Sequence, residues 1–276
     1  METYDTDVLI IGGGATGAGV LRDLALRGIP AILIDRRDLN AGASGGNHGL
    51  LHSGGRYAAT DTETAAECRR EGDILKRVAP HCIDDCGGIF VAVEGDDPEF
   101  AARFPAACAA AGISCEDLTP DAARGRVPAL PETVIAAYAV PDATIDPFRL
   151  VLEQVSQAEA LTGSRYLPHT GIEGFEIDGG KIVAAQARDL KSGAEIRITA
   201  RQIVNAAGAW SGMVAALAGS HAVRVTASKG TLILSNTRIS KGVINRLRPP
   251  GDGDILVPGG TVSILGTSSV TIADPD

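Results

Sequence analysis

The sequence lacks the features of a membrane-spanning or nucleic-acid-binding chain. No stretch approaches the roughly 18 consecutive apolar residues that a transmembrane helix needs, and residues 1–7 carry acids but no base, unlike a secretory signal. The net charge of −9 leaves no general positive excess for nucleic acid or a membrane surface. We therefore expect a cytoplasmic protein with no nucleic-acid partner and no direct membrane insertion.

Cysteine and aromatic residues are also scarce. The five cysteines form an odd number in a long chain without a signal, which does not suggest a disulfide framework. Cys82 and Cys86 are close in sequence, but no nearby Cys/His pair completes a metal site, so we expect no bound metal. Glycine, by contrast, accounts for 34 residues, a composition suited to tight turns and to close approach of the backbone to a ligand.

The chain opens with the pattern of a βαβ unit. An apolar run at residues 7–11 leads into a glycine-rich turn, a helix is expected over residues 18–27, and a second apolar run occupies residues 31–34. Further helices are predicted at 62–78, 97–112, 146–161 and 211–217, and strands at 89–93, 134–140, 202–207, 231–234, 255–257 and 262–265. Residues 165–200 are typical of one strand followed by a β-meander, so the predicted fold class is α/β.

The turn Gly12-x-Gly14-x-x-Gly17 has the context of a dinucleotide site. It follows a strand, opens a helix through Ala15 and Thr16, and stands 23 positions before Asp35. The glycines allow a tight turn and close approach to a pyrophosphate, and the helix N-terminus favours its negative charge. An acid at Asp35 would accept hydrogen bonds from a ribose diol. The turn alone does not separate NAD from FAD.

A second segment favours FAD. Residues 203–211, IVNAAGAWS, form a strand that ends in small side chains such as Ala207 and Gly208, against which a dinucleotide could lie. This segment follows the meander about 190 residues after the first motif. The order is similar to that of FAD-dependent oxidoreductases of the D-amino-acid oxidase superfamily. Taken alone, the segment could equally be an ordinary core strand.

A long loop at residues 38–55 breaks all periodicity, which is unusual for a loop without function. Its glycines would let the backbone run against a planar ring. Arg56 offers a rigid fork of donors for a phosphate or a carboxylate, and His52 titrates near neutrality and could handle a proton. Without further information, Arg56 could equally pair with a surface acid.

At this point the whole chain resembles the N-terminal region of the FAD-dependent glycerol-3-phosphate dehydrogenases, especially the A-type subunit of the anaerobic enzymes. The segments that carry the resemblance are IGGGATGAG at 11–19, NHGLLHSGGRY at 47–57, DPFRL at 146–150, VNAAG at 204–208, KG at 229–230, DILVP at 254–258 and GTS at 266–268. The family continues beyond this length with a further glycine-rich segment and a cysteine-containing region. The resemblance therefore implies that the chain corresponds to the N-terminal portion.

The resemblance also implies residue roles. Arg56 matches the arginine that binds the substrate phosphate, Lys229 matches a position facing the substrate cavity, and His52 lies in the loop beside the flavin. A proton-transfer role for His52 is our own hypothesis. The expected FAD contacts are Gly12, Gly14, Ala15, Thr16, Gly17, Asp35, Arg36, Ser44, Asn47, His48, Gly49, Leu51, Ala207, Gly208 and Trp210.

The expected architecture is a Rossmann-like FAD-binding domain with a β-meander, interleaved with an α+β substrate domain. The FAD-binding domain is predicted at residues 1–80 and 145–222, and the substrate domain at 81–144 and 223–276. The implied reaction is oxidation of sn-glycerol 3-phosphate to dihydroxyacetone phosphate. Electrons would pass to a quinone through electron-transfer partner subunits, which could hold the protein at the inner face of the membrane.

Two other functions fit the sequence. A flavin oxidase for a 2-hydroxy acid such as L-2-hydroxyglutarate shares a comparable histidine-containing loop, although Arg56 before Tyr57 favours a phosphorylated substrate. The chain could also be a non-catalytic flavin-binding module that acts in assembly.

Overall fold

The computed structural model describes residues 1–249 and 251–276, which divide into two compact units. Unit 1 consists of residues 1–46, 147–228 and 271–276, and unit 2 of residues 47–146 and 229–270. The chain leaves unit 1 after residue 46, whereas the predicted cofactor domain extends to residue 80. Each unit is thus assembled from segments that are far apart in the sequence.

Unit 1 is built on a six-stranded sheet with the order β10-β11-β12-β1-β2-β9. Its strands are β1 (Glu2–Ile11), β2 (Ala31–Ile34), β9 (Arg165–Leu167), β10 (Thr170–Asp178), β11 (Lys181–Asp189) and β12 (Glu195–Asn205). β12, β1, β2 and β9 run parallel, and β10 and β11 extend the sheet as an antiparallel meander. This arrangement agrees with the predicted βαβ unit and meander.

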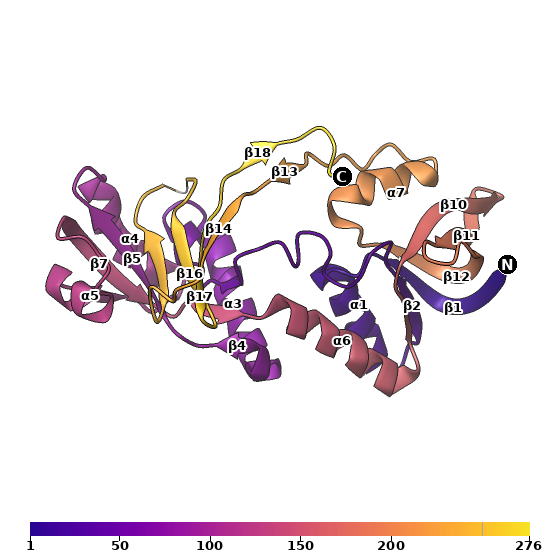
Figure 1. The fold of residues 1–276 in the computed structure, drawn as a ribbon, viewed down its shortest axis with the longest axis horizontal. Helices are drawn as coiled ribbons and strands as arrows, with labels where there is room; N and C mark the ends of the chain where they lie inside the picture. The colour runs from indigo at the N-terminus through magenta and orange to yellow at the C-terminus, as the bar shows by residue number, and fades with distance from the viewer. Residues whose placement is uncertain (250) are drawn as a thin grey trace. The chain divides into compact units, whose positions relative to one another are not determined.

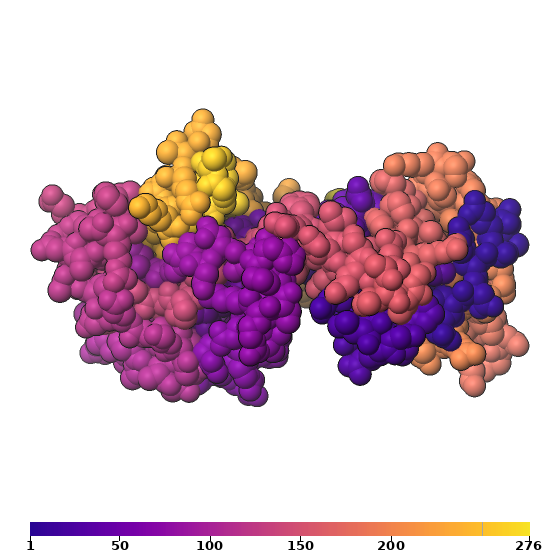
Figure 2. Space-filling model, turned by 90° about the horizontal axis from the view of Figure 1, so that it is seen from below, coloured from indigo at the N-terminus to yellow at the C-terminus, as the bar shows by residue number. Residues whose placement is uncertain are grey.

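The two faces of this sheet are covered differently because successive side chains of a strand point to opposite sides. Ile10 packs with residues of α1 (Ala15–Leu26) and α6 (Pro147–Thr162). Figure 1 shows these two helices side by side, and in Figure 2 the α6 segment lies against the indigo N-terminal segment. On the other face, Leu9 packs with meander residues such as Ile198. η2 (Gly208–Trp210) and α7 (Ser211–Leu217) follow β12.

One predicted boundary in unit 1 is wrong. The last meander strand and the strand expected at 202–207 are a single continuous strand, β12. It pairs with β1 from Glu2↔Ile196 to Ile11↔Asn205. β1 is correspondingly longer than the apolar run at 7–11, because its polar first half is held by this pairing rather than by burial.

Unit 2 is built on a seven-stranded sheet with the order β14-β17-β16-β15-β5-β7-β6. Its strands are β5 (Gly88–Val93), β6 (Glu116–Leu118), β7 (Val134–Val140), β14 (Leu232–Ser235), β15 (Val243–Arg246), β16 (Ile255–Gly259) and β17 (Val262–Gly266). β15 pairs with β5 in parallel, and the other neighbours are antiparallel. A small sheet of β3 (Leu50–Leu51), β8 (Ala143–Ile145) and β4 (Ile83–Asp84) completes the unit.

Helices cover both faces of the β5–β7 region. On one face, Phe90 of β5 packs against Phe104 of α4 (Pro98–Ala110), with ring centroids 4.7 Å apart. α2 (Gly55–Ala58) and α3 (Thr62–Val78) contribute to the same cluster through Ala58 and Ala65. On the other face, Val91 packs with residues of α5 (Pro120–Arg126).

The sequence analysis missed several short elements, among them α5 and β15. α5 begins at Pro120 after Thr119, whose hydroxyl accepts the Ala122 amide, a cap signal that the sequence did contain. β15 is only four residues long and is defined by its partners. The remaining elements are η1 (Pro80–Cys82) and the paired β13 (Ser228–Lys229) and β18 (Val270–Thr271). Within residues 1–249 and 251–276, no helix has the length and apolarity to cross a membrane.

We expect Gly17→Ala to destabilise unit 1. A Cβ at Gly17 would lie 1.9 Å from the Gly12 carbonyl oxygen, so α1 would have to move away from the turn. Such overpacking costs about 1–3 kcal/mol. The matched control is Gly19→Ala in the same helix, where a Cβ meets nothing within 4 Å and is expected to be neutral or slightly stabilising. Equal melting temperatures for the two variants would contradict this packing argument.

Candidate functional site

The glycine turn of unit 1 packs against its neighbours more closely than residues with a Cβ would allow. Gly12 has φ +119°, and a Cβ there would lie 2.3 Å from the Ala206 carbonyl oxygen at the end of β12. A Cβ on Gly14 would lie 2.9 Å from the Ser44 hydroxyl oxygen. Glycine is therefore needed at these positions for the turn to pack so closely, as the motif predicts.

The N-terminus of α1 is suited to an anion. Gly14 is its N-cap and makes no side-chain cap bond, and the first turn carries no acid. The Ala15 amide donates to the Ser44 hydroxyl at 2.9 Å, and Thr16 is exposed. Amide donors at the start of a helix and the helix dipole favour a phosphate group. These residues fit the pyrophosphate of a dinucleotide.

Asp35 lies directly after β2 and is fixed by two backbone amides. One carboxylate oxygen accepts the Gly13 amide at 2.7 Å, and the other accepts the Arg37 amide at 2.7 Å. A carboxylate oxygen has two lone pairs, so each retains capacity for a ribose hydroxyl. Asp35, the acid expected from the sequence, is thus held in place at the carboxyl end of β2.

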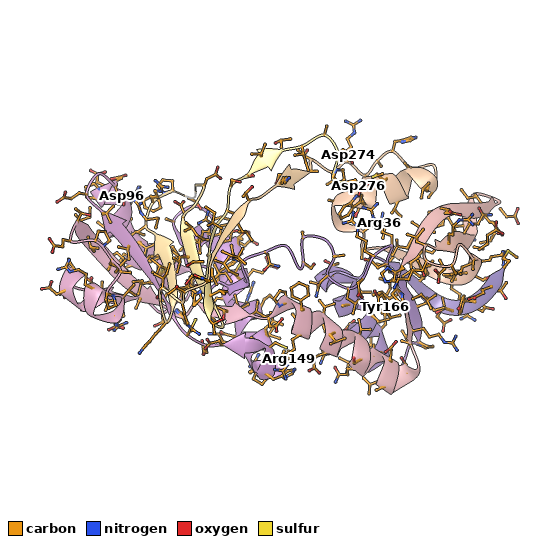
Figure 3. The ribbon with its side chains drawn as sticks, in the orientation of Figure 1. Arg36, Asp96, Arg149, Tyr166, Asp274 and Asp276 are labelled. Atoms are coloured by element: carbon orange, nitrogen blue, oxygen red, sulfur yellow. The ribbon has the colours of Figure 1, made fainter. Side chains whose placement is uncertain are left out.

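Arg36 and Trp210 meet within unit 1. The Arg36 guanidinium lies over the Trp210 ring, 4.5 Å from its centroid, and pairs with Asp276. Trp210 donates its indole N–H to Asp276 at 3.0 Å. Figure 3 shows Arg36 and Asp276 together beside the sheet of unit 1. The bond from Arg36 lowers the pKa of the Asp276 carboxyl. The aromatic ring and guanidinium offer stacking surface to a planar group.

The other expected contacts of the turn after β12 are also in unit 1. Gly208 has φ +56° and begins η2, and the Ala207 amide donates to Asn205 at 3.3 Å. Asn40, which the sequence analysis did not single out, is buried with φ +61°. Its backbone N–H donates to the Gly13 carbonyl at 3.0 Å, so Asn40 holds the glycine turn in place.

The second half of the loop belongs to unit 2 and is tightly folded. The Asn47 side chain accepts the Gly49 amide at 2.7 Å, and the His48 ring accepts the Leu50 amide at 3.2 Å. Gly49 has φ +70°, and a Cβ there would lie 2.8 Å from the Ile145 carbonyl oxygen. Leu51 is half-buried in β3. The loop is therefore ordered by its own polar side chains.

His52 is half-buried, in a position suited to a proton acceptor. Its Nδ1 is buried and has no hydrogen-bond partner in the part of the chain that the structure describes, and its ring meets Tyr57 edge-on at 5.4 Å. Burial lowers the pKa of His52, and Arg56 adds to this while the Asp142 carboxylate opposes it. Burial and Arg56 likewise lower the pKa of His48. Both imidazoles are therefore neutral at pH 7.

Asp142, which the sequence analysis missed, holds the segment after His52. Its side chain is 1% exposed; one oxygen accepts the Ser53 amide at 2.7 Å, and the other accepts the Asn245 side-chain amide at 2.9 Å. Asn245 is itself buried in β15. The signal was a lone acid immediately after the strand 134–140, but its partners are about 90 and 100 positions away.

Arg56 and Lys229 are placed differently. Arg56 lies in α2, near enough to both histidines to affect their pKa values, and donates to the Gly251 carbonyl at 3.3 Å. Across the part of the chain that the structure describes, Arg56 has no ion pair with a carboxylate. Lys229 is exposed in β13, and no hydrogen bond or ion pair of its side chain is found among the same residues. His48, His52 and Arg56 thus lie close enough to influence one another, and among the described residues no interaction joins the Lys229 side chain to them.

The glycine turn, the βαβ unit and the meander define unit 1 as a dinucleotide-binding domain of the flavoprotein type. The chain belongs to the FAD dependent oxidoreductase family, which it matches over residues 7–276. Membership in this family confirms the predicted cofactor, FAD, and the predicted superfamily.

Curated relatives refine the comparison. The chain is 45% identical over 271 residues to the A-type subunit of the anaerobic glycerol-3-phosphate dehydrogenase of Escherichia coli K12, covering 98% of this chain and 50% of the relative. It is 39% identical over 278 residues to the A1-type subunit of the anaerobic glycerol-3-phosphate dehydrogenase of Haloferax volcanii, covering 98% and 47%. The chain thus spans about half the length of these relatives, which agrees with the resemblance to an N-terminal portion.

Solved structures support the fold. Glycerol-3-phosphate dehydrogenase from Bacillus halodurans, complexed with FAD, has a TM-score of 0.75 at 24% identity, covering 98% of this chain and 48% of that one. L-α-glycerophosphate oxidase from Mycoplasma pneumoniae, with FAD bound, has a TM-score of 0.80 at 16% identity, covering 100% and 73%. The predicted α/β architecture of a D-amino-acid oxidase superfamily member is confirmed.

We expect Asp142→Ala to destabilise unit 2 strongly. The change leaves the Ser53 amide and the Asn245 side-chain amide without acceptors, and each buried unsatisfied donor costs about 1–3 kcal/mol. Urea unfolding should therefore show a loss of roughly 2–6 kcal/mol. Asp117→Ala, at an exposed acid in β6, is the control and should change little. A loss below about 1 kcal/mol for Asp142→Ala would show that the two donors find other partners.

Proposed function

We propose that this chain is the FAD- and substrate-binding portion of an enzyme that oxidises sn-glycerol 3-phosphate to dihydroxyacetone phosphate. The observation that carries the proposal is that a half-buried His52, whose Nδ1 makes no hydrogen bond, lies close to Arg56, which has no acidic partner within residues 1–249 and 251–276. Such a pair offers a proton acceptor and a phosphate ligand within one short segment. The names of the relatives, which are 39–45% identical, support the same substrate.

Unit 1 would hold the cofactor. Gly12, Gly14 and the amides at the start of α1 would bind the pyrophosphate, and Asp35 would accept the ribose hydroxyls. Arg36 and Trp210 would stack on a planar part of the cofactor. Bound FAD supplies the acceptor for the hydride that leaves C2 of the substrate.

The residues of unit 2 would act on the substrate. Arg56 would neutralise the phosphate with a rigid fork of donors. His52, neutral because burial lowers its pKa, would accept the proton of the C2 hydroxyl as that carbon is oxidised. Asn47, His48, Gly49 and Leu51 would contact the flavin or its phosphates, and Lys229 would line the substrate cavity.

We further infer that electrons leave through partner subunits to a quinone. The relatives are named as one subunit of an anaerobic enzyme, which supports an assembly with further subunits. Such subunits would place the protein at the inner face of the membrane, since no helix of the described residues could cross it. Otherwise the protein would be cytoplasmic.

The proposed reaction predicts a change in the visible absorption of the flavin. The purified protein should show the visible absorption of oxidised FAD, and anaerobic addition of glycerol 3-phosphate should bleach it because the substrate reduces the cofactor. Glycerol without phosphate is the control and should bleach it far more slowly. Bleaching by L-2-hydroxyglutarate but not by glycerol 3-phosphate would instead identify a 2-hydroxy-acid oxidase, and an unreactive flavin would favour a non-catalytic module.

The proposed role of Arg56 predicts weaker substrate binding when this arginine is removed. Arg56→Ala should raise the KM for glycerol 3-phosphate roughly 10- to 100-fold, which is the loss of one strong charge-assisted contact, and should leave the FAD content unchanged. Arg126→Ala, which breaks a surface ion pair with Glu116, is the control and should leave KM unchanged. Loss of FAD in Arg56→Ala would assign the arginine to cofactor binding.

A further inference from the structure

Two further arginines of unit 2 lie near Arg56. Three arginines, Arg56, Arg246 and Arg248, line one small pocket, together with Phe90 and Phe104. Arg56 comes from α2, whereas the other two stand at the end of β15 and just after it. Three like charges on an apolar wall are costly unless they are balanced. Their partners therefore indicate what the pocket is built to hold.

Arg246 is anchored by a nearly buried acid. Its Nη2 lies 2.7 Å from each oxygen of Asp96, whose side chain is 7% exposed. Asp96 stands in the turn after β5, as labelled in Figure 3, and also accepts the Val93 amide at 2.8 Å. Burial alone would raise the pKa of Asp96, but these bonds lower it. The Nε of Arg246 is buried and has no acceptor among the described residues.

Arg248 is anchored in the same way by Asp254. Its Nε and Nη2 donate to one Asp254 oxygen at 2.9 Å and 2.6 Å, and the side chain of Asp254 is 1% exposed. The other Asp254 oxygen accepts the Gly251 amide at 2.7 Å. Gly251 in turn accepts the bond from Arg56. The loop that orients Arg248 thus also contacts Arg56.

The balance of charge leaves the pocket positive. Two carboxylates face three guanidiniums, so one positive charge is uncompensated in a chain whose net charge is −9. Among the described residues Arg56 has no carboxylate partner and donates only to the Gly251 carbonyl, so its other N–H groups remain available to an acceptor. A planar carboxylate can engage one fork well, whereas a tetrahedral phosphate presents several acceptor oxygens on one centre.

We propose that Arg246 and Arg248 complete, with Arg56, a three-guanidinium pocket that takes the phosphate group of a phosphomonoester substrate. This inference rests on the proposed function, in which Arg56 alone was assigned to the phosphate. Asp96 and Asp254 are positioning residues: they hold two of the guanidiniums in place without neutralising the third.

The test removes each arginine together with its acid. Arg246→Gln with Asp96→Asn, and Arg248→Gln with Asp254→Asn, avoid leaving a buried carboxylate unpaired. We expect each paired variant to raise the KM for glycerol 3-phosphate roughly 10- to 100-fold with kcat changed little, and to weaken inorganic phosphate binding, measured by calorimetry, by a similar factor. Arg126→Gln with Glu116→Gln, a surface pair of the same unit, is the matched control.

A measurement on the unaltered protein covers the case in which a paired variant does not fold. Phenylglyoxal modifies arginines, and peptide mass spectrometry reports each site. Inorganic phosphate should slow the modification of Arg56, Arg246 and Arg248 but not of Arg126. Absence of this protection would overturn the proposal.

The outcomes separate the pocket from the reaction. Paired variants that keep the KM and the phosphate affinity of the unaltered protein would overturn the pocket, even if glycerol 3-phosphate bleaches the flavin. Phosphate binding that is lost in the paired variants, in a protein whose flavin glycerol 3-phosphate does not reduce, would support the pocket and reject the proposed reaction.

Discussion

The buried carboxylate of Asp142 connects the two segments of unit 2 on which the candidate chemistry depends. It holds the Ser53 amide on one side and the Asn245 side chain on the other. Ser53 follows His52 in the chain, and Asn245 precedes Arg246. One acceptor therefore fixes the histidine loop relative to the strand that ends in the arginine pocket, and a buried network of this kind is strong only when every member is satisfied.

Local features of the fold were predictable from the sequence because they depend on neighbouring residues. The helix at 62–78 and the strand at 134–140 were placed at their observed bounds, since caps and apolar runs mark them. The glycine turn was recognised because each of its glycines has a steric reason that the sequence pattern encodes.

What the sequence did not reveal depends on distant partners. β12 is one strand because β1 pairs along its whole length, and no local pattern in 195–205 signals that. Arg246 and Arg248 look like surface charges until Asp96, 150 positions earlier, and the fold of the 251–254 loop are known. The roles of the glycine turn and of Asp35 followed from their spacing, whereas the position of Lys229 at the substrate cavity came from a family resemblance alone.

The pairing of β1 with β12 also bears on synthesis of the chain. β12 follows β1 by about 190 residues, so at 5–20 residues per second a ribosome delivers it roughly 10–40 s later. During that interval one edge of β1, with its apolar residues Leu9 and Ile10, has no strand beside it. Unpaired apolar edges are prone to aggregate. This edge of β1 is thus exposed to wrong pairing until the last parallel strand of unit 1 emerges.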